Sequence, residues 1–190
     1  MWYNGGMEVG DWITLFAVIV ALSIGVASFL HTQNLQKKER RERLLNEIIE
    51  WTRNITKYRF GKSCKELLQI TDRYGETSYK KSLQFVHADV VEVKEAFAGL
   101  GIQSRYIREI ASIFGADLNE ATQVLTEQIN EYVKYLDEWS GTLADEIEEQ
   151  KKEIDTVSSA SEADKIGQQI DESAKKVMEE TAKIKAKDIS

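Results

Sequence analysis

The chain has 190 residues, which is enough for one ordinary domain and an appendage. Its formal net charge at pH 7 is −7, and this acidic balance argues against nucleic acid as the main partner. A single cysteine, Cys64, excludes an intramolecular disulfide and a cysteine-rich zinc site.

The chain contains no proline, and its eleven glycines are isolated or in close pairs. That distribution is typical of helix ends. We therefore predict an all-α protein with one N-terminal transmembrane helix, a cytoplasmic helical bundle and a helical hairpin or coiled-coil-like tail.

The first predicted element is a membrane span over residues 12–31. No Asp, Glu, Lys or Arg occurs between Asp11 and Lys37, and a helix over these residues is about 30 Å long, the thickness of the bilayer's hydrocarbon core. A cleaved signal peptide is the competing interpretation. It is disfavoured because residues 1–11 carry Glu8 and Asp11 but no lysine or arginine, whereas a signal begins with basic residues. Residues 1–11 are then predicted to form a short extracytoplasmic N-terminus.

A basic run follows the span and predicts its orientation; it consists of Lys37, Lys38, Arg40, Arg41 and Arg43. Positive charge collects on the cytoplasmic side of a span. We expect a single-pass protein of the cell membrane with its N-terminus outside and its C-terminal domain in the cytoplasm. The run either contacts anionic lipid headgroups or serves only to stop translocation.

Small residues recur every fourth position within the span, at Ala17, Ala21 and Gly25. This spacing lets two helix backbones approach closely, so it predicts self-association. The alternative is that the spacing has no function, since small residues are common in membrane helices.

The juxtamembrane residues 32–60 are expected to continue the span as one helix, because neither Gly nor Pro occurs between Val26 and Phe60. An apolar stripe with spacings of 3 and 4 runs along it, through Leu44, Ile48, Trp51, Ile55 and Tyr58. This stripe predicts that the helix is docked, either on the rest of the chain or on a second copy.

Residues 61–140 are predicted to form a helical bundle. The first two predicted helices are a short one from Cys64 to Gly75 and one over 83–100. A shorter helix follows between Gly101 and Gly115. The last helix is expected to be capped by Asp117 and Glu120 and to run through Leu125 to Leu143. Gly141 either ends this last helix or is tolerated within it.

Residues 141–190 are predicted to form a charged helical arm, because no aromatic residue follows Trp139 and the apolar stripe is narrow. Ser161 and Asp164 are expected to cap its second helix. The arm residues predicted to self-associate are Ile147, Ile154, Ile166, Ile170 and Val177.

No motif carries recognisable chemistry. Gly61-Lys62-Ser63 ends like a phosphate-binding loop, but Thr56 stands where that loop needs its first glycine. The two histidines, His31 and His87, lie far apart. We therefore expect no cofactor, no metal and no catalysis.

The function predicted is that of a non-catalytic, membrane-anchored scaffold or interaction module. The alternative is an accessory subunit of a larger membrane complex for transport, secretion or signalling. The expected partners are the lipid bilayer and either a second copy or another membrane protein. An enzyme with an unrecognised site is the third reading.

Overall fold

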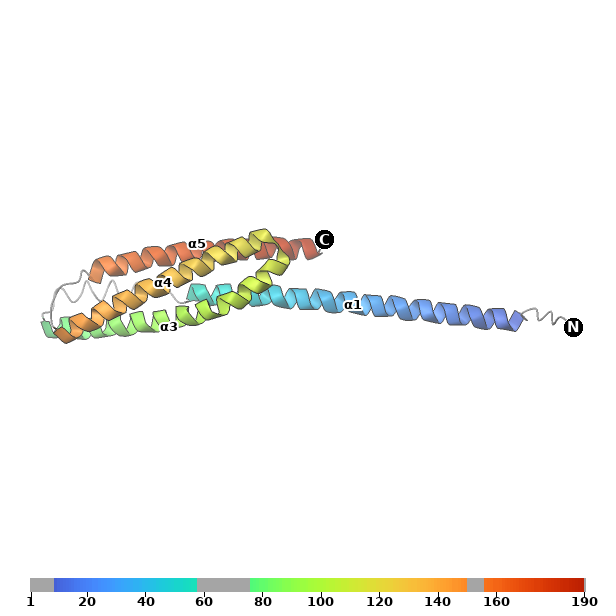
Figure 1. The fold of residues 1–190 in the computed structure, drawn as a ribbon, viewed down its shortest axis with the longest axis horizontal. Helices are drawn as coiled ribbons and strands as arrows, with labels where there is room; N and C mark the ends of the chain where they lie inside the picture. Colours follow the sequence, from blue (N-terminus) through green and yellow to red (C-terminus); the bar gives the residue numbers. More distant parts are fainter. Residues whose placement is uncertain (1–8, 58–75, 150–155, 190) are drawn as a thin grey trace. The chain divides into compact units, whose positions relative to one another are not determined.

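The computed structural model of the chain describes residues 9–57, 76–149 and 156–189. These residues form four helices and no strand: α1 (Val9–Lys57), α3 (Glu76–Phe114), α4 (Ala116–Glu149) and α5 (Thr156–Ile189). The all-α prediction is confirmed for this part of the chain (Figure 1). The predicted short helix from Cys64 to Gly75 lies outside the described residues.

The chain divides into two compact units, residues 1–44 and residues 45–190. In the first unit, the described residues belong to the single helix α1, which begins at Val9 and continues without a break past residue 44. Of the juxtamembrane residues 32–60 predicted to continue the apolar segment as one helix, residues 32–57 belong to α1, and the last three lie outside the described residues.

The second unit is a helical bundle in which α4 packs against both α3 and α5 (Figure 1). The predicted apolar stripe of α3 lies in the core of this unit, and all of its members are buried: Leu83, Val86, Val90, Val93, Phe97 and Leu100. The stripe of α4 faces it, and the Phe97 and Tyr132 rings meet edge to face at 5.0 Å. Burial of one face of each helix is what the spacing of 3 and 4 predicts.

The prediction that a helix ends at Gly101 is wrong, because α3 runs through Gly99 and Gly101 to Phe114. Gly101 instead lies where α3 approaches α4. A Cβ atom at this position would come within 3.3 Å of Asn130 Oδ1 and 3.7 Å of Ile129 Cγ2. The glycine therefore allows close packing between helices rather than ending one.

Gly115 forms the turn between α3 and α4 with a positive φ of 133°, a conformation that favours glycine. The N–H of Asn119 donates to the Gly115 carbonyl at 3.2 Å. Since α4 begins at Ala116, the prediction that Asp117 caps it is wrong: Asp117 lies inside the first turn, where its charge still favours the helix dipole.

The boundary predicted near residue 141 does not coincide with a helix end, since α4 continues through Gly141 to Glu149. Ser161 and Asp164 are likewise interior to α5, which begins at Thr156, so the prediction that they cap a helix is wrong. Small side chains make up much of the buried face of α5, namely Ala160, Ala163 and Ala174. They allow α5 to lie close to α4 without aromatic residues.

Candidate functional site

The most prominent surface of the first unit is the apolar stretch of α1 from Phe16 to Leu30. Every residue in this range is exposed, with Phe16 at 69% and Phe29 at 62% of their full accessible surface. The helix that contains it is long and apolar enough to cross a membrane, and none of its most apolar window is buried. The core helix of a soluble protein would bury such a window.

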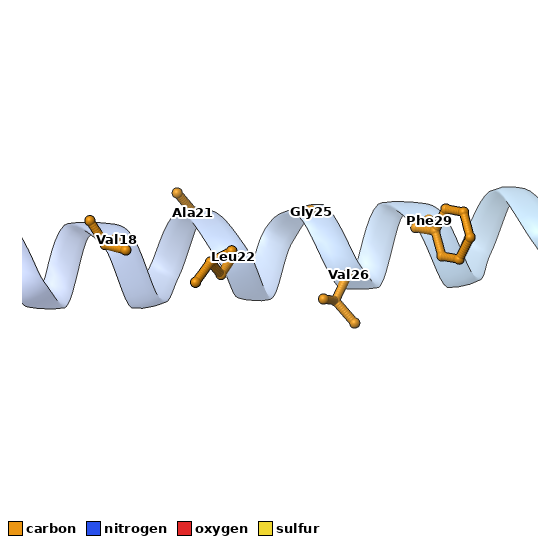
Figure 2. Close-up of a pocket in the computed structure, with 6 residues that line it drawn as sticks. All are labelled: Val18, Ala21, Leu22, Gly25, Val26 and Phe29. Carbon is orange, nitrogen blue, oxygen red and sulfur yellow. The ribbon is translucent and has the colours of Figure 1, made fainter.

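Six residues line a shallow apolar groove along one face of this stretch: Val18, Ala21, Leu22, Gly25, Val26 and Phe29 (Figure 2). Two of the three residues of the span that were predicted to self-associate, Ala21 and Gly25, lie in it. A Cβ atom at Gly25 would meet nothing within 4 Å, and Ala17 is also exposed. The groove therefore has room for a partner's side chains at its small residues.

The hydroxyl groups of Ser23 and Thr32 are satisfied within the helix. Ser23 Oγ donates to the Ile19 carbonyl at 2.8 Å, and Thr32 Oγ1 donates to the Ser28 carbonyl at 2.9 Å. In a bilayer an unsatisfied hydroxyl is costly because no water is present to pair with it. These two bonds make both residues compatible with an apolar surrounding.

The basic run lies on α1 after the apolar stretch, and all five of its residues, Lys37, Lys38, Arg40, Arg41 and Arg43, are exposed. Helical geometry spreads five charges within seven residues around the helix rather than onto one face. This arrangement suits a collar around α1 better than a flat docking patch.

In the second unit, the end of α1 is docked on its own chain. Ile48, Trp51 and Ile55 are buried, and Trp51 Nε1 donates to the Leu100 carbonyl of α3 at 3.1 Å. Tyr106 of α3 also donates to Glu47 at 2.9 Å. Of the two docking alternatives, the structure provides the intramolecular one; Tyr58 lies outside the described residues.

The residues predicted for arm pairing have different environments. Ile170 and Val177 are buried where α5 packs within the second unit, so their apolar character is explained without a second copy. Ile147 and Ile166 are half-buried, and Ile154 lies outside the described residues. Pairing of this arm between copies stays a prediction.

Two tyrosines of α4 have perturbed acidity. Burial is the main cause that raises the pKa of Tyr132, and the negative charge of Asp164 adds to it. Burial is also the main cause that raises the pKa of Tyr135, whose hydroxyl donates to the Ser159 carbonyl at 2.9 Å. Both tyrosines are therefore neutral structural groups near pH 7, and Tyr135 ties α4 to α5.

Residues 9–57, 76–149 and 156–189 contain no group of three His, Cys, Asp or Glu side chains arranged to hold a metal ion. Asp164 and Glu162 act on the tyrosines only through their charge, and Lys165 pairs with Glu162 on the surface at 2.9 Å.

The outer side of α3 carries an apolar group that sequence reasoning missed. Ile102, Tyr106 and Ile113 are 81%, 53% and 69% exposed, although they lie between buried residues of the same helix. Their separations of 4 and 7 residues place them on one face. The spacing of these three residues can be seen in the sequence. The buried stripe of α3 has the same period, however, so the sequence does not distinguish the exposed apolar residues from the buried ones.

The chain matches no protein-family model, no curated protein and no solved structure.

Proposed function

We propose that this protein is a single-pass membrane protein in which the apolar part of α1 spans the bilayer and residues 45–190 form a cytoplasmic interaction module. The observation that carries the proposal is the fully exposed apolar stretch from Phe16 to Leu30. Leaving that surface in water costs about 25 cal/mol for each Å² of apolar area. A bilayer removes the cost without requiring any other protein.

The basic run supports the orientation, with the N-terminus outside. Five lysines and arginines follow the apolar stretch, from Lys37 to Arg43, while residues 1–11 contain none. Positive residues near the end of a span favour the cytoplasmic side. Contact of the same residues with anionic headgroups would add about 1 kcal/mol for each charge near the surface.

The experiment for this topology uses a membrane-impermeant maleimide on intact cells. Cys64 should react only after the membrane is opened. Because reactivity also depends on exposure, two single-cysteine variants in a Cys64→Ser background accompany it. Gln103→Cys, on the exposed side of α3, should behave like Cys64, whereas Asn4→Cys should react before lysis. Labelling of Gln103→Cys in intact cells would refute the proposed topology.

A non-catalytic scaffold is the role we favour for the module. It is supported by the docking of α1 on its own chain. Trp51 and Ile55 are buried within the second unit, so they do not need a helix of another protein to cover them. The module then presents its outer surfaces to partners, while the groove at Ala21 and Gly25 offers a contact for a second span.

The second candidate is an accessory subunit of a larger membrane complex, in which the groove holds a foreign span. Cross-linking in native membranes followed by mass spectrometry distinguishes the two. Recovery of the chain's own dimers, abolished by Gly25→Leu, supports the self-associating scaffold. Recovery of a foreign membrane protein in constant ratio identifies the subunit role and rejects the scaffold.

A further inference from the structure

The helix α5 packs mainly on α4, and the surface through which it does so contains few large side chains. Among its described residues the buried ones are Ala160, Ala163, Ile170, Ala174, Val177 and Thr181. The buried face of α3, by contrast, consists mainly of Leu, Val, Ile and Phe side chains from Leu83 to Ile110. Because hydrophobic stabilisation grows with the apolar area buried, α5 is held on α4 less strongly than α3 is.

Different sides of α4 face α5 and α3. The Tyr135 hydroxyl donates to the Ser159 carbonyl of α5 at 2.9 Å. Asp137 instead pairs with Lys94 of α3, at 2.9 Å between Oδ1 and Nζ. At about 100° per residue, Gln128 lies about 20° from Tyr135 and about 180° from Asp137 around the helix axis. Gln128 therefore belongs to the side of α4 that α5 covers.

The side chain of Gln128 holds an unpaired acceptor. Its Oε1 atom is buried and has no hydrogen-bond partner among the residues that the structure describes. A buried acceptor of this kind has given up its hydrogen bond to water without gaining another, and this loss costs free energy. Departure of α5 returns water to the atom, so the cost acts against the contact between α4 and α5.

Two hydrogen bonds between described residues connect α5 to other helices, one near each of its ends. The first is the bond between Tyr135 and the Ser159 carbonyl, and in the second Lys185 Nζ donates to Asn46 Oδ1 of α1 at 2.7 Å. Tyr135 and Lys185 are half-buried and Asn46 is exposed. Water replaces such bonds when the helix leaves, so they position α5 but contribute little net free energy.

We propose that α5 is a releasable cover, which leaves α4 as one cooperative unit while α3 and α4 stay packed together. In the open state water reaches the side of α4 around Gln128 and Tyr135, so α5 controls access to that side. Cooperative segments of this kind open at a lower free energy than the whole domain unfolds. Because α4 and α5 both lie within residues 45–190, the release does not depend on the membrane topology.

Hydrogen exchange of the unaltered full chain in detergent, measured on peptides by mass spectrometry, tests the release. After correction for intrinsic rates, the amides of residues 160–181 should exchange at least about tenfold faster than those of residues 83–110, and they should share one degree of protection. Equal protection of α3 and α5 would show that they open only together and would overturn the proposal. Protection that declines steadily towards residue 189 would show fraying of one end, which also overturns it.

Buried cysteines test the same release at single positions, in a Cys64→Ser background. Ala163→Cys and Ala174→Cys lie on the buried face of α5, and Ala111→Cys on α3 is the matched control, since all three alanines are 0% exposed. The two α5 variants should react with a thiol reagent at similar rates, at least about tenfold faster than Ala111→Cys. Rates no higher than that of Ala111→Cys would contradict the release of α5.

The role of Gln128 is tested by Gln128→Met, which keeps an unbranched side chain but removes the unpaired amide oxygen. This variant should slow the exchange of α5 at least about threefold, because the closed state no longer contains the unpaired group. The control Gln169→Met makes the same change at an exposed position of α5 and should leave the exchange unaltered. Unaltered exchange in Gln128→Met would refute the assigned role.

A variant of the contact between α3 and α4 distinguishes release from unfolding of the whole unit. Phe97 meets the Tyr132 ring of α4 at 5.0 Å, and this contact remains in the open state. Phe97→Leu should therefore speed the exchange of α3, which requires that contact to break, and leave the exchange of α5 unchanged. Equal acceleration of both helices would show that α5 leaves only when the whole unit unfolds, against the proposal.

Discussion

Two glycines in and just after α3 have opposite backbone requirements. Gly115 has a φ of 133°, whereas Gly99 lies in the helix interior, is exposed, and has open space at its Cβ position. Gly115→Ala should lower the free energy of unfolding by about 1–2 kcal/mol, since a side chain is strained at positive φ. Gly99→Ala should raise it by about 0.5–1 kcal/mol.

Urea unfolding of the full chain in detergent, followed by helicity, measures both effects. Gly99→Ala is the matched control, because it makes the same chemical change a few turns away. Equal shifts of the same sign in the two variants would show that backbone conformation at Gly115 does not matter.

Tyr132 predicts a loss of stability at alkaline pH. Burial and the charge of Asp164 raise its pKa in the folded protein above the ordinary value of 10.0. The folded state therefore keeps the proton after the unfolded state has released it, and stability falls as the pH rises above about 10. The slope from this residue is about 1.4 kcal/mol for each pH unit between the two pKa values.

Measurement of unfolding at pH 8, 10 and 11 for the native chain and for Tyr132→Phe isolates this contribution. The variant keeps the ring that meets Phe97 but cannot ionise, so its stability should fall less steeply. If the stability of the two proteins fell equally with pH, the pKa of Tyr132 would be the same in the folded and the unfolded state.

At the scale of elements, the docking of α1 depends on Trp51. Its side chain is buried and its Nε1 donates to the Leu100 carbonyl, so Trp51→Ala should cost about 3–5 kcal/mol. Trp51→Phe keeps much of the volume and should cost less, mainly through the lost hydrogen bond and some packing. Arg53→Ala, on the exposed side of the same turn, should change stability by less than about 0.5 kcal/mol.

Unfolding curves of these three variants give the comparison. If Trp51→Ala were as stable as Arg53→Ala, the end of α1 would not be part of the cooperative unit.

Helix faces were predictable where the spacing of apolar residues is regular. The buried stripe of α3 from Leu83 to Leu100 was identified because six residues keep a period that only a helix provides. The role of Gly101 was not predictable, because the need for a small residue comes from Asn130 and Ile129 on another helix. Local sequence contains no information about that approach.

The start of α4 shows the same limit. Asp117 and Glu120 have the spacing of a capping pair, but Gly115 already turns the chain, so the helix begins one residue before the expected cap. In the candidate site, the exposed stretch of α1 and the basic run followed from composition. The outer stripe of α3 did not, since exposure depends on which helices pack on each face.

At the scale of the whole molecule, the basic run should determine which side of the membrane the C-terminal unit occupies. Replacement of Lys37, Lys38, Arg40, Arg41 and Arg43 by Gln removes the charge difference across the apolar stretch. A fraction of the molecules should then insert in the opposite direction. Their Gln103→Cys residue would react with impermeant maleimide in intact cells.

The matched control replaces the two acidic residues of the same turns, Glu39→Gln and Glu42→Gln, since acidic residues contribute little to orientation. It should leave the labelling pattern unchanged. Similar labelling in the five-residue variant and in the control would show that the basic run does not set the orientation.

The bond between Lys185 and Asn46 joins residues from opposite ends of the second unit. Lys185 Nζ donates to Asn46 Oδ1 at 2.7 Å, although 139 positions separate the two residues. During synthesis Asn46 is made long before Lys185. Because Asn46 lies in α1 and Lys185 lies in α5, the unit reaches its final packing only after α5 has been synthesised and has left the ribosome. Until then, the buried face of α4 that α5 will cover is open to chaperones and proteases.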